Sequence, residues 1–354
     1  MRILHLLNHT NRLNGHVHAA VDIACAQAKL GHTVCVASGS GDFEELLRKK
    51  SVETVVIDHK RTTRNLLKSG MALKRFVRSW QADIVHAHMM TSAVLAWPVC
   101  KLARIPLVTT VHNEFEKSAI LMGLGTRVIA VSDAVSVSMR RRGVSQSRLR
   151  VVLNGTIGSA RFESRSTADT ALFHPNILFV GGLHPRKGLA DLFEAFEIVN
   201  GQVPESRLYI VGGGPLEATY KESVAKMRCA GAITFLGVQS DPFGYMLAAD
   251  IFVLPSHADP APLVLSEARE ARCAVVATNV GGIPQLLEYG DAGLIVEPHD
   301  PRGLAAVLCN LLENSRSIEE WKEKSQKNIG RLTIERVARE TMDIYGEAIS
   351  QLQK

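Results

Sequence analysis

Short apolar runs recur along almost the whole chain and alternate with segments of helical periodicity. The first half of the chain contains RILHLL, TVCVAS, TVVI, DIVHA, PLVTTV, RVIAV and LRVVL, and the second contains NILFV, RLYIV, ITFLG, IFVLP, AVVAT and GLIV. Runs of this length are typical of buried strands, and connecting helices of about ten residues or more favour strands that run parallel. The alternation therefore predicts an α/β fold whose sheets are covered by helices on both faces.

A chain of 354 residues is long enough for two domains. A polar, aperiodic stretch at 158–173 interrupts the alternation and is typical of a linker. We predict an N-terminal domain over 1–157 and a C-terminal domain over 174–325. A charged amphipathic pattern runs from Glu319 to Gln353, and its last part, 326–354, is predicted to be a separate helical tail.

Composition favours a soluble globular protein of the cytoplasm. The sequence has no apolar run of about 18 residues and no cleavage pattern after the first strand, so neither a membrane span nor a signal peptide is expected. Its six cysteines show no CxxC spacing and lie mostly in apolar runs, which predicts reduced thiols.

Charge is distributed unevenly between the two halves. Residues 1–173 contain 24 Lys and Arg against 12 Asp and Glu, a net charge of +12, whereas the remainder has a net charge of −6. The basic residues concentrate in 60–78 and 140–142. Two interpretations stay open: a solvated basic face, or a surface for an anionic or membrane-borne acceptor. Nucleic acid is not expected as a partner, because aromatic residues make up only 5% of the chain and do not interleave with the basic ones.

The stretch 255–298 carries the most specific chemical signal. Its turn HADPAP contains two prolines, which suit the first turn of a helix, and helical periodicity begins at Leu263. Glu267 falls on the apolar stripe of that helix, with Asp259 eight residues earlier in the turn. A helix start attracts anions, and a buried carboxylate needs donors such as hydroxyl groups. This combination suits a sugar nucleotide.

The same stretch resembles the retaining glycosyltransferases of the GT-B fold, glycosyltransferase family 4. Their signature is an acidic residue, seven others and then Glu, followed by a strand of small residues and a Gly-Gly-x-Pro turn; here it reads Asp259, PAPLVLS, Glu267, AVVATNVGGIPQLL. The first acid is Asp where Glu is usual, and Ala261 stands where Phe is common. The resemblance covers essentially the whole chain.

The resemblance implies two doubly wound Rossmann-like domains facing across a cleft, with the last helix crossing back to the first domain. It also implies a metal-independent, retaining transferase that moves a sugar from a UDP- or GDP-linked donor to a saccharide or lipid-linked acceptor, as in polysaccharide biosynthesis. The expected location is cytoplasmic, including peripheral association with an anionic membrane. Two alternatives remain: a GT-B epimerase acting on the nucleotide sugar, and a sugar-nucleotide-binding protein of weak activity.

Site residues follow from the matched positions. The resemblance places Glu267 on the ribose hydroxyls, Asp259 towards the sugar and His112, which ends PLVTTVHN, against the donor sugar. Lys187 precedes a helix in GGLHPRKGLADL, where an ammonium group meets a diphosphate or is simply solvated. Family members usually carry Arg five residues before this Lys, where this chain has Gly182, and Arg186 is the candidate replacement.

Further donor contacts are expected mainly from the backbone. They involve a glycine in the first strand–helix loop, the VGGGP turn, the residue after FLG and the start of the signature helix, namely Gly15, Gly213, Val238, Pro262, Leu263 and Val264. Gly15 also suits an ordinary Asn-Gly turn, and the absence of G-x-G-x-x-G there argues against a dinucleotide cofactor.

No cofactor and no metal ion are expected. The sequence lacks Asp-x-Asp, so fixed cations and the helix start are predicted to replace a metal at the diphosphate. His86 and His88 in DIVHAH are interpreted as structural, because their spacing and the lack of a third ligand argue against zinc.

Overall fold

The computed structural model describes residues 1–12, 14–60, 62–163 and 170–352. The chain divides into two compact units, 1–163 with 332–354 and 164–331. The boundary near 163 falls inside the predicted linker 158–173, of which 164–169 lies outside the described residues. Residues before the boundary pack on unit 1: the carboxylate of Asp22 accepts hydrogen bonds from Thr156, Ser159 and Arg161.

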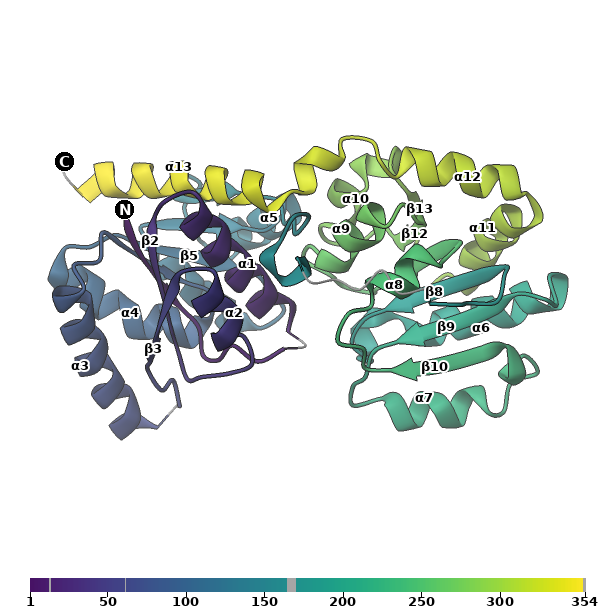
Figure 1. Cartoon of the computed structure of the whole chain (residues 1–354), viewed down its shortest axis with the longest axis horizontal. Helices are drawn as coiled ribbons and strands as arrows, with labels where there is room; N and C mark the ends of the chain where they lie inside the picture. Colours follow the sequence, from purple (N-terminus) through teal and green to yellow (C-terminus); the bar gives the residue numbers. More distant parts are fainter. Residues whose placement is uncertain (13, 61, 164–169, 353–354) are drawn as a thin grey trace. The chain divides into compact units, whose positions relative to one another are not determined.

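Unit 1 alternates strands and helices (Figure 1). Its elements are β1 (Arg2–Leu6), α1 (Gly15–Lys29), β2 (Thr33–Ser38), α2 (Glu44–Lys49), β3 (Val52–Val56), α3 (Thr63–Ser79), β4 (Ile84–Ala87), α4 (Met90–Ala103), β5 (Leu107–Val111), β6 (Arg127–Ala130), α5 (Asp133–Arg141), β7 (Leu149–Val151) and α13 (Ile334–Leu352). The strands form one parallel sheet in the order β3-β2-β1-β4-β5-β6-β7. The strands β1 and β5 are almost fully buried, as expected of a parallel sheet covered on both faces, and they include the buried polar residues His5, Thr109 and Thr110.

Unit 2 repeats this architecture. Its elements are β8 (Asn176–Val180), α6 (Leu189–Gln202), β9 (Arg207–Val211), α7 (Glu217–Val224), β10 (Ile233–Gly237), α8 (Phe243–Leu247), β11 (Ile251–Leu254), α9 (Leu263–Glu270), β12 (Ala274–Thr278), α10 (Ile283–Leu286), β13 (Leu294–Val296), α11 (Pro301–Glu313) and α12 (Ser315–Lys324). The parallel sheet has the order β10-β9-β8-β11-β12-β13.

Both sheets reverse their strand order at one point, between β1 and β4 in unit 1 and between β8 and β11 in unit 2. Chains leaving two such strands diverge to opposite faces, so the sheet edge stays open to ligands there. The residues that follow these four strands are therefore the first places to look for a site.

The C-terminal part of the chain differs from the single helical pattern expected over 319–353. The structure has two helices there, α12 and α13, separated by a 3₁₀ turn at Ile329–Leu332. A side chain stabilises the chain at this break: the fully buried Arg269 of α9 donates to the carbonyl groups of Ser325 and Lys327, just after α12 ends. A helix end leaves its last carbonyl groups without intrahelical partners, and the guanidinium group supplies donors to carbonyl groups here.

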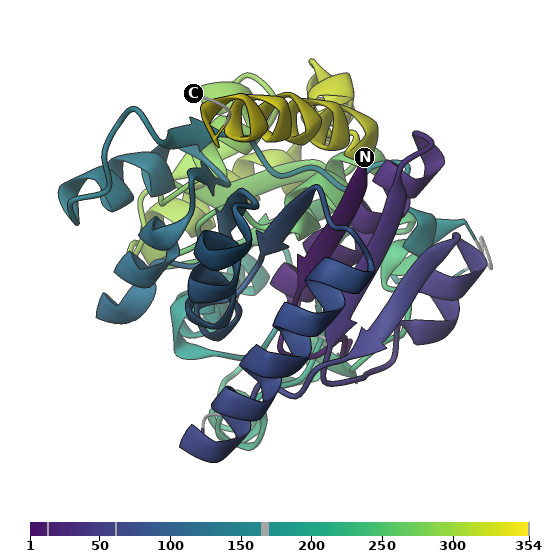
Figure 2. The same cartoon turned by 90° about the vertical axis from the view of Figure 1, so that its left-hand side faces the viewer.

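The last helix, α13, belongs to unit 1 and lies along α1 (Figures 1 and 2). Ile334 and Ala338 pack on Ile23 of α1, and Ile344, Tyr345 and Ala348 join the main core of that unit. Unit 1 is thus built from both ends of the chain.

No helix among the described residues is long and apolar enough to cross a membrane. All six cysteines are buried and unpaired with one another.

Candidate functional site

The switch point of unit 2 brings together three of the predicted residues. Lys187 ends a 3₁₀ turn after β8, and Asp259 lies in the turn after β11. Lys187 Nζ lies 2.5 Å from Asp259 Oδ2, and both side chains are buried, at 8% and 6% exposure. The guanidinium group of Arg186 lies 3.8 Å from the same oxygen. Two cations therefore converge on one carboxylate.

Close backbone contacts hold the Asp259 turn in place. The peptide N–H of His257 donates to the carbonyl oxygen of Arg186, and that of Gly282 donates to the carbonyl oxygen of Asp259. Gly188 and Gly281 adopt left-handed conformations, and a Cβ on either would lie 1.9 Å from a backbone oxygen of this turn. Only glycine permits these approaches.

Helix α9 begins directly after this turn. Its N-cap is Pro262, no side chain caps its first turn, and that turn contains no acidic residue. The first amide groups, of Leu263 and Val264, are therefore left to a ligand or water, and the positive end of the helix dipole favours an anion there. Glu267, one turn further on, is buried at 9% exposure, as the apolar stripe predicted.

The remaining predicted residues of unit 2 lie along the neighbouring turns. A Cβ on Gly213 would lie 2.8 Å from Val238, and a Cβ on Gly182 would lie 2.9 Å from the ring of His184. The imidazole of His184 therefore lies against Gly182, the position at which the family resemblance led us to expect Arg. Sequence reasoning did not single out His184, and only its place within HPRK could have drawn attention to it.

In unit 1 the predicted residues follow β1 and β5. Gly15 is the first residue of α1 rather than part of the preceding loop, and a Cβ on it would meet nothing within 4 Å. The fold itself does not require glycine here. His112 directly follows β5, and its Nε2 lies 3.1 Å from Nδ1 of His88.

The argument that His86 and His88 lack a third ligand is wrong. His5 of β1 lies beside them, and the three residues could bring one ligand atom each to within 4.8 Å of the others. Their six ring nitrogens already have hydrogen-bond partners, which are Gln27, Thr110, Tyr345, His112 and one another. A metal ion would have to displace several of these bonds. The absence of a metal from the reaction stays a prediction.

A second group of this kind lies in unit 2. Nε2 of His257 is 2.8 Å from an Asp191 oxygen, and Nδ1 of His299 is 3.9 Å from the same atom. These residues lie beside the Lys187 turn, since Asp191 is in the first turn of α6.

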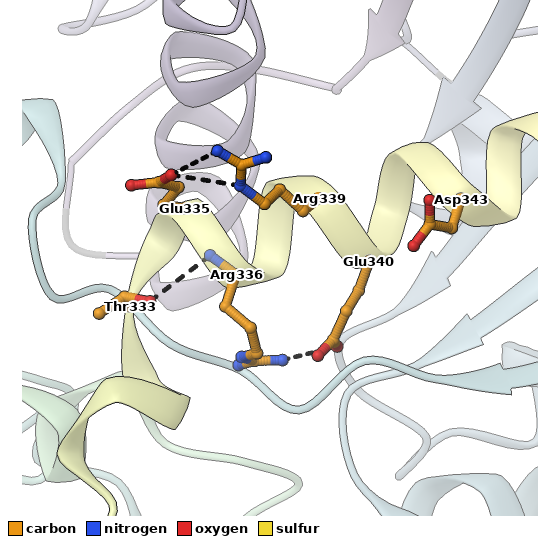
Figure 3. Close-up of a pocket in the computed structure, with 6 residues that line it drawn as sticks. All are labelled: Thr333, Glu335, Arg336, Arg339, Glu340 and Asp343. Carbon is orange, nitrogen blue, oxygen red and sulfur yellow. Dashed lines mark hydrogen bonds and ion pairs between the residues drawn. The ribbon is translucent and has the colours of Figure 1, made fainter.

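A hollow of about 320 Å³ lies along α13 (Figure 3). It is lined by Thr333, Glu335, Arg336, Arg339, Glu340 and Asp343, none of which was predicted as a site residue. Arg336 pairs with Glu340 and Arg339 with Glu335. These charges neutralise each other, so the hollow is not a candidate active site.

Family models match both units of the chain. The model described as Glycosyltransferase Family 4 matches residues 13–156, and the model described as Glycosyl transferases group 1 matches residues 174–314. The chain belongs to the family 4 glycosyltransferases. The matched ranges contain the site residues of both units, so the resemblance carried by Asp259 and Glu267 is confirmed at the level of the family.

Relatives of this glycosyltransferase include the glycogen synthase of Mycobacterium tuberculosis, which is 30% identical over 273 residues. That alignment covers 70% of this chain and 65% of the relative, slightly less than two thirds of its length. The phosphatidyl-myo-inositol mannosyltransferase of Mycolicibacterium smegmatis is 28% identical over 299 residues, covering 79% of this chain and 76% of that protein.

The fold is that of solved GT-B glycosyltransferases. The Anabaena protein HepE, crystallised with UDP and glucose, superimposes with a TM-score of 0.81 at 20% identity. The match covers 98% of this chain and 100% of that chain. The predicted GT-B class, with two parallel sheets covered by helices, is therefore confirmed.

Proposed function

We propose that this family 4 glycosyltransferase moves a sugar from a UDP- or GDP-linked donor to a saccharide or lipid-linked acceptor, with retention of the anomeric configuration. The observation that carries the proposal is the convergence of Lys187 and Arg186 on Asp259 beside the uncapped start of α9. Fixed cations and a helix start together suit a nucleoside diphosphate.

Transfer requires stabilisation of the leaving diphosphate, whose negative charge grows as the bond to the sugar breaks. Lys187 and Arg186 supply positive charge, and the amide groups of Leu263 and Val264 supply donors. Groups fixed by folding need not reorganise during the reaction, so this stabilisation is the largest expected contribution to the rate. The same groups would act without a metal ion.

The carboxylates have separate proposed tasks. Glu267, buried on α9, accepts the ribose hydroxyls of the donor, and Asp259 faces the sugar. Asp259 is held by the Lys187 ammonium at 2.5 Å, and a carboxylate in a tight ion pair is a poor nucleophile. This supports retention by attack of the acceptor on the face that the leaving group vacates, without an enzyme nucleophile.

Unit 1 would handle the sugar and the acceptor. Gly15 supports this assignment, because the fold leaves open space around it and a ligand could approach its backbone. The similarity to a phosphatidyl-myo-inositol mannosyltransferase supports a lipid-linked acceptor, and α3 exposes Leu67 and Met71 among basic residues. Association with an anionic membrane surface is part of the proposal.

The test is a panel of nucleotide sugars offered to the purified full-length protein, with free nucleotide and the sugar product measured separately. Binding would first be ranked by thermal shift. Release of UDP or GDP with an α-linked product from an α-linked donor supports a retaining transferase. Isomerised nucleotide sugar would identify an epimerase, and binding without turnover would identify a weakly active binding protein.

A further inference from the structure

A chain of buried hydrogen bonds connects α13 to His112. Tyr345 OH lies 3.3 Å from Nε2 of Gln27, and Oε1 of Gln27 lies 2.8 Å from Nε2 of His5. Nδ1 of His5 lies 2.9 Å from Nε2 of His88, whose Nδ1 lies 3.1 Å from Nε2 of His112. We call these five residues the relay. Gln27, His5 and Tyr345 are fully buried, and His88 is 4% exposed.

The histidines of the relay are neutral at physiological pH. Burial lowers the pKa of His5 to about 4 and that of His112 to about 3, and burial also holds the pKa of His88 well below its ordinary value. A neutral imidazole carries one N–H and one lone pair. A ring that accepts a hydrogen bond at one nitrogen therefore donates one at the other. All the hydrogen bonds along a row of such rings run in the same direction.

The amide of Gln27 sets that direction. Its oxygen only accepts, so His5 donates from Nε2 and keeps a lone pair on Nδ1. His88 must then donate from Nε2 to His5, and His112 must donate from Nε2 to His88. Rotating the amide by half a turn would reverse every bond of the relay.

Tyr345 secures the amide at its other end. Its hydroxyl accepts from Nε2 of Gln27 and can donate its own proton to Nδ1 of His86, 2.6 Å away. His86 then donates from Nε2 to Thr110, at 2.7 Å. Gln27 Nε2, the Tyr345 hydroxyl and His86 Nε2 thus each donate to an acceptor on this side of the relay.

The open end of the relay lies at Nδ1 of His112. This atom is buried and has no hydrogen-bond partner among the described residues, although the His112 residue itself is partly exposed. The relay leaves a lone pair on it, which is the cheaper arrangement, since buried N–H groups without an acceptor are rarer than acceptors without a donor. Nε2 of His16 is also buried without a partner, and the two rings lie 6.4 Å apart.

We propose that Gln27 is a positioning residue which, through His5 and His88, holds His112 as its Nε2–H tautomer, so that Nδ1 of His112 accepts a hydrogen bond from a sugar hydroxyl. A lone pair can accept from a hydroxyl but cannot donate to a phosphate oxygen. A hydroxyl of the donor sugar, which the family resemblance places beside His112, therefore fits this atom, whereas a phosphate oxygen does not. The identity of this ligand rests on the proposed function, whereas the tautomer does not.

The first experiment reads the tautomer directly. Full-length protein with ¹⁵N-labelled histidine is examined by long-range ¹H–¹⁵N NMR at pH 7, and His112→Gln identifies the signals of His112. Wild type is expected to show a proton on Nε2 and a lone pair on Nδ1. Gln27→Met removes the fixed acceptor, and Tyr345→Phe removes the group that orients the amide. Both variants should show a mixture of tautomers at His112.

Thr109→Val is the matched control. Thr109 is on the same strand as Thr110 and makes an equally buried hydrogen bond, 2.6 Å to the carbonyl oxygen of Met122, outside the relay. Its loss should destabilise the unit to a similar degree and leave the tautomer of His112 unchanged. A proton on Nδ1 in wild type would overturn the proposal, and so would a tautomer that stays fixed in a folded Gln27→Met or Tyr345→Phe protein.

The second experiment compares UDP-glucose with UDP as probes by calorimetry. Loss of one oriented hydrogen bond should weaken UDP-glucose binding by roughly two- to tenfold in Gln27→Met, with UDP binding unchanged. Equal weakening of both would contradict the assignment of His112 to the sugar. GDP-mannose and GDP are compared in the same way. If wild type binds none of the four probes, the proposed function and the ligand assignment fail, while the NMR result still decides whether the relay exists.

Discussion

The ammonium group of Lys187 is almost completely buried, and Asp259 neutralises it in the absence of a ligand. A buried ion pair costs several kcal/mol when one partner is removed, because the other charge is left without compensation. A bound diphosphate offers Lys187 a second anion. Substitutions of Lys187 and of Asp259 should therefore have different effects on binding of the diphosphate.

We expect Lys187→Ala to lower transfer on the order of a hundredfold or more and to weaken binding of the nucleoside diphosphate, because a preorganised cation is lost. Lys187→Arg should recover only part of this, since the guanidinium group is larger and planar. Asp259→Asn should lower transfer without weakening diphosphate binding, because the ammonium group of Lys187 stays free to bind the diphosphate. Steady-state rates and calorimetry with UDP check both. Unchanged transfer in Lys187→Ala would place the diphosphate elsewhere.

For Glu267 the expected effect is on donor affinity. Glu267→Ala should weaken binding of the donor by roughly tenfold or more, the cost of losing charge-assisted hydrogen bonds to two hydroxyls, while the protein stays folded. Glu270→Ala, three residues further along α9, is the matched control. Donor titrations and thermal unfolding of both variants test this expectation. Equal donor affinities of the two variants would show that Glu267 does not contact the donor.

At the scale of elements, Arg269 fixes α9 to its surroundings. Its guanidinium group is fully buried and donates to the carbonyl groups of Ser325, Leu286 and Lys327. Burial lowers the pKa of Arg269 to about 10, so it keeps its charge at neutral pH. Arg269 thus ties the helix that carries Glu267 to the end of α10 and to the segment that follows α12.

Arg269→Met should destabilise unit 2 by about 3–5 kcal/mol, because three buried carbonyl groups lose their donor. Urea unfolding measures this, with Arg272→Met as the control, since Arg272 is exposed on the same segment. A loss below about 1 kcal/mol would show that water replaces the guanidinium group.

Most elements were predictable because their pattern is local. The strands, the start of α9 at Leu263 and the burial of Glu267 follow from periodicity and proline placement. The break between α12 and α13 was not predictable, because Arg269, which donates to the carbonyl groups there, lies more than fifty residues away in the sequence. The relay was not predictable for the same reason. His5 is on β1, whereas His88 and His112 directly follow β4 and β5, and only the strand order β1-β4-β5 brings the three together.

At the scale of the whole molecule, the buried histidines make stability depend on pH. Burial lowers the pKa of His5, His16 and His59 to about 4 and that of His112 to about 3, and all four belong to unit 1. Their pKa in the unfolded chain is about 6.5, so between these values the unfolded state binds more protons.

The free energy of unfolding should therefore be constant above about pH 6.5 and fall as the pH drops from 6.5 towards 4. Each histidine contributes up to about 1.4 kcal/mol per pH unit within this window. Urea unfolding at pH 7, 5.5 and 4.5 measures how steeply the free energy of unfolding depends on pH. His59→Gln should reduce this dependence by the contribution of about one bound proton. Equal stability at pH 7 and 5 would contradict the neutral state of these residues.

The charge asymmetry also acts on the whole molecule. One face of α3 carries Arg64, Leu67, Lys68, Met71 and Arg75, all exposed. Figure 2 shows this helix in blue on the side of unit 1 nearest the viewer. Arg140 and Arg141 are exposed on α5, but Arg142 is not a free member of that cluster, since it donates to the carbonyl groups of Glu114 and Glu116.

We expect the protein to bind anionic liposomes at low salt and to dissociate as salt rises, because each basic residue near such a surface contributes about 1 kcal/mol. Changing Lys68 and Arg75 to Gln should weaken binding further, as should the same change at Arg140 and Arg141. Arg142→Gln is unsuitable, because it breaks a structural contact. Co-sedimentation with anionic and neutral vesicles is the measurement, and no binding at low salt would remove the membrane from the proposal.

The return of the chain to unit 1 has a consequence for biosynthesis. A ribosome delivers residues 164–331 before it delivers α13, so unit 2 can fold while unit 1 still lacks its last helix. Until then Ile23 of α1 has no cover, and Gln27 has no Tyr345 to orient it. Unit 1 is therefore begun before unit 2 and completed after it, and the hydrogen bonds that orient His112 form only once α13 has been made.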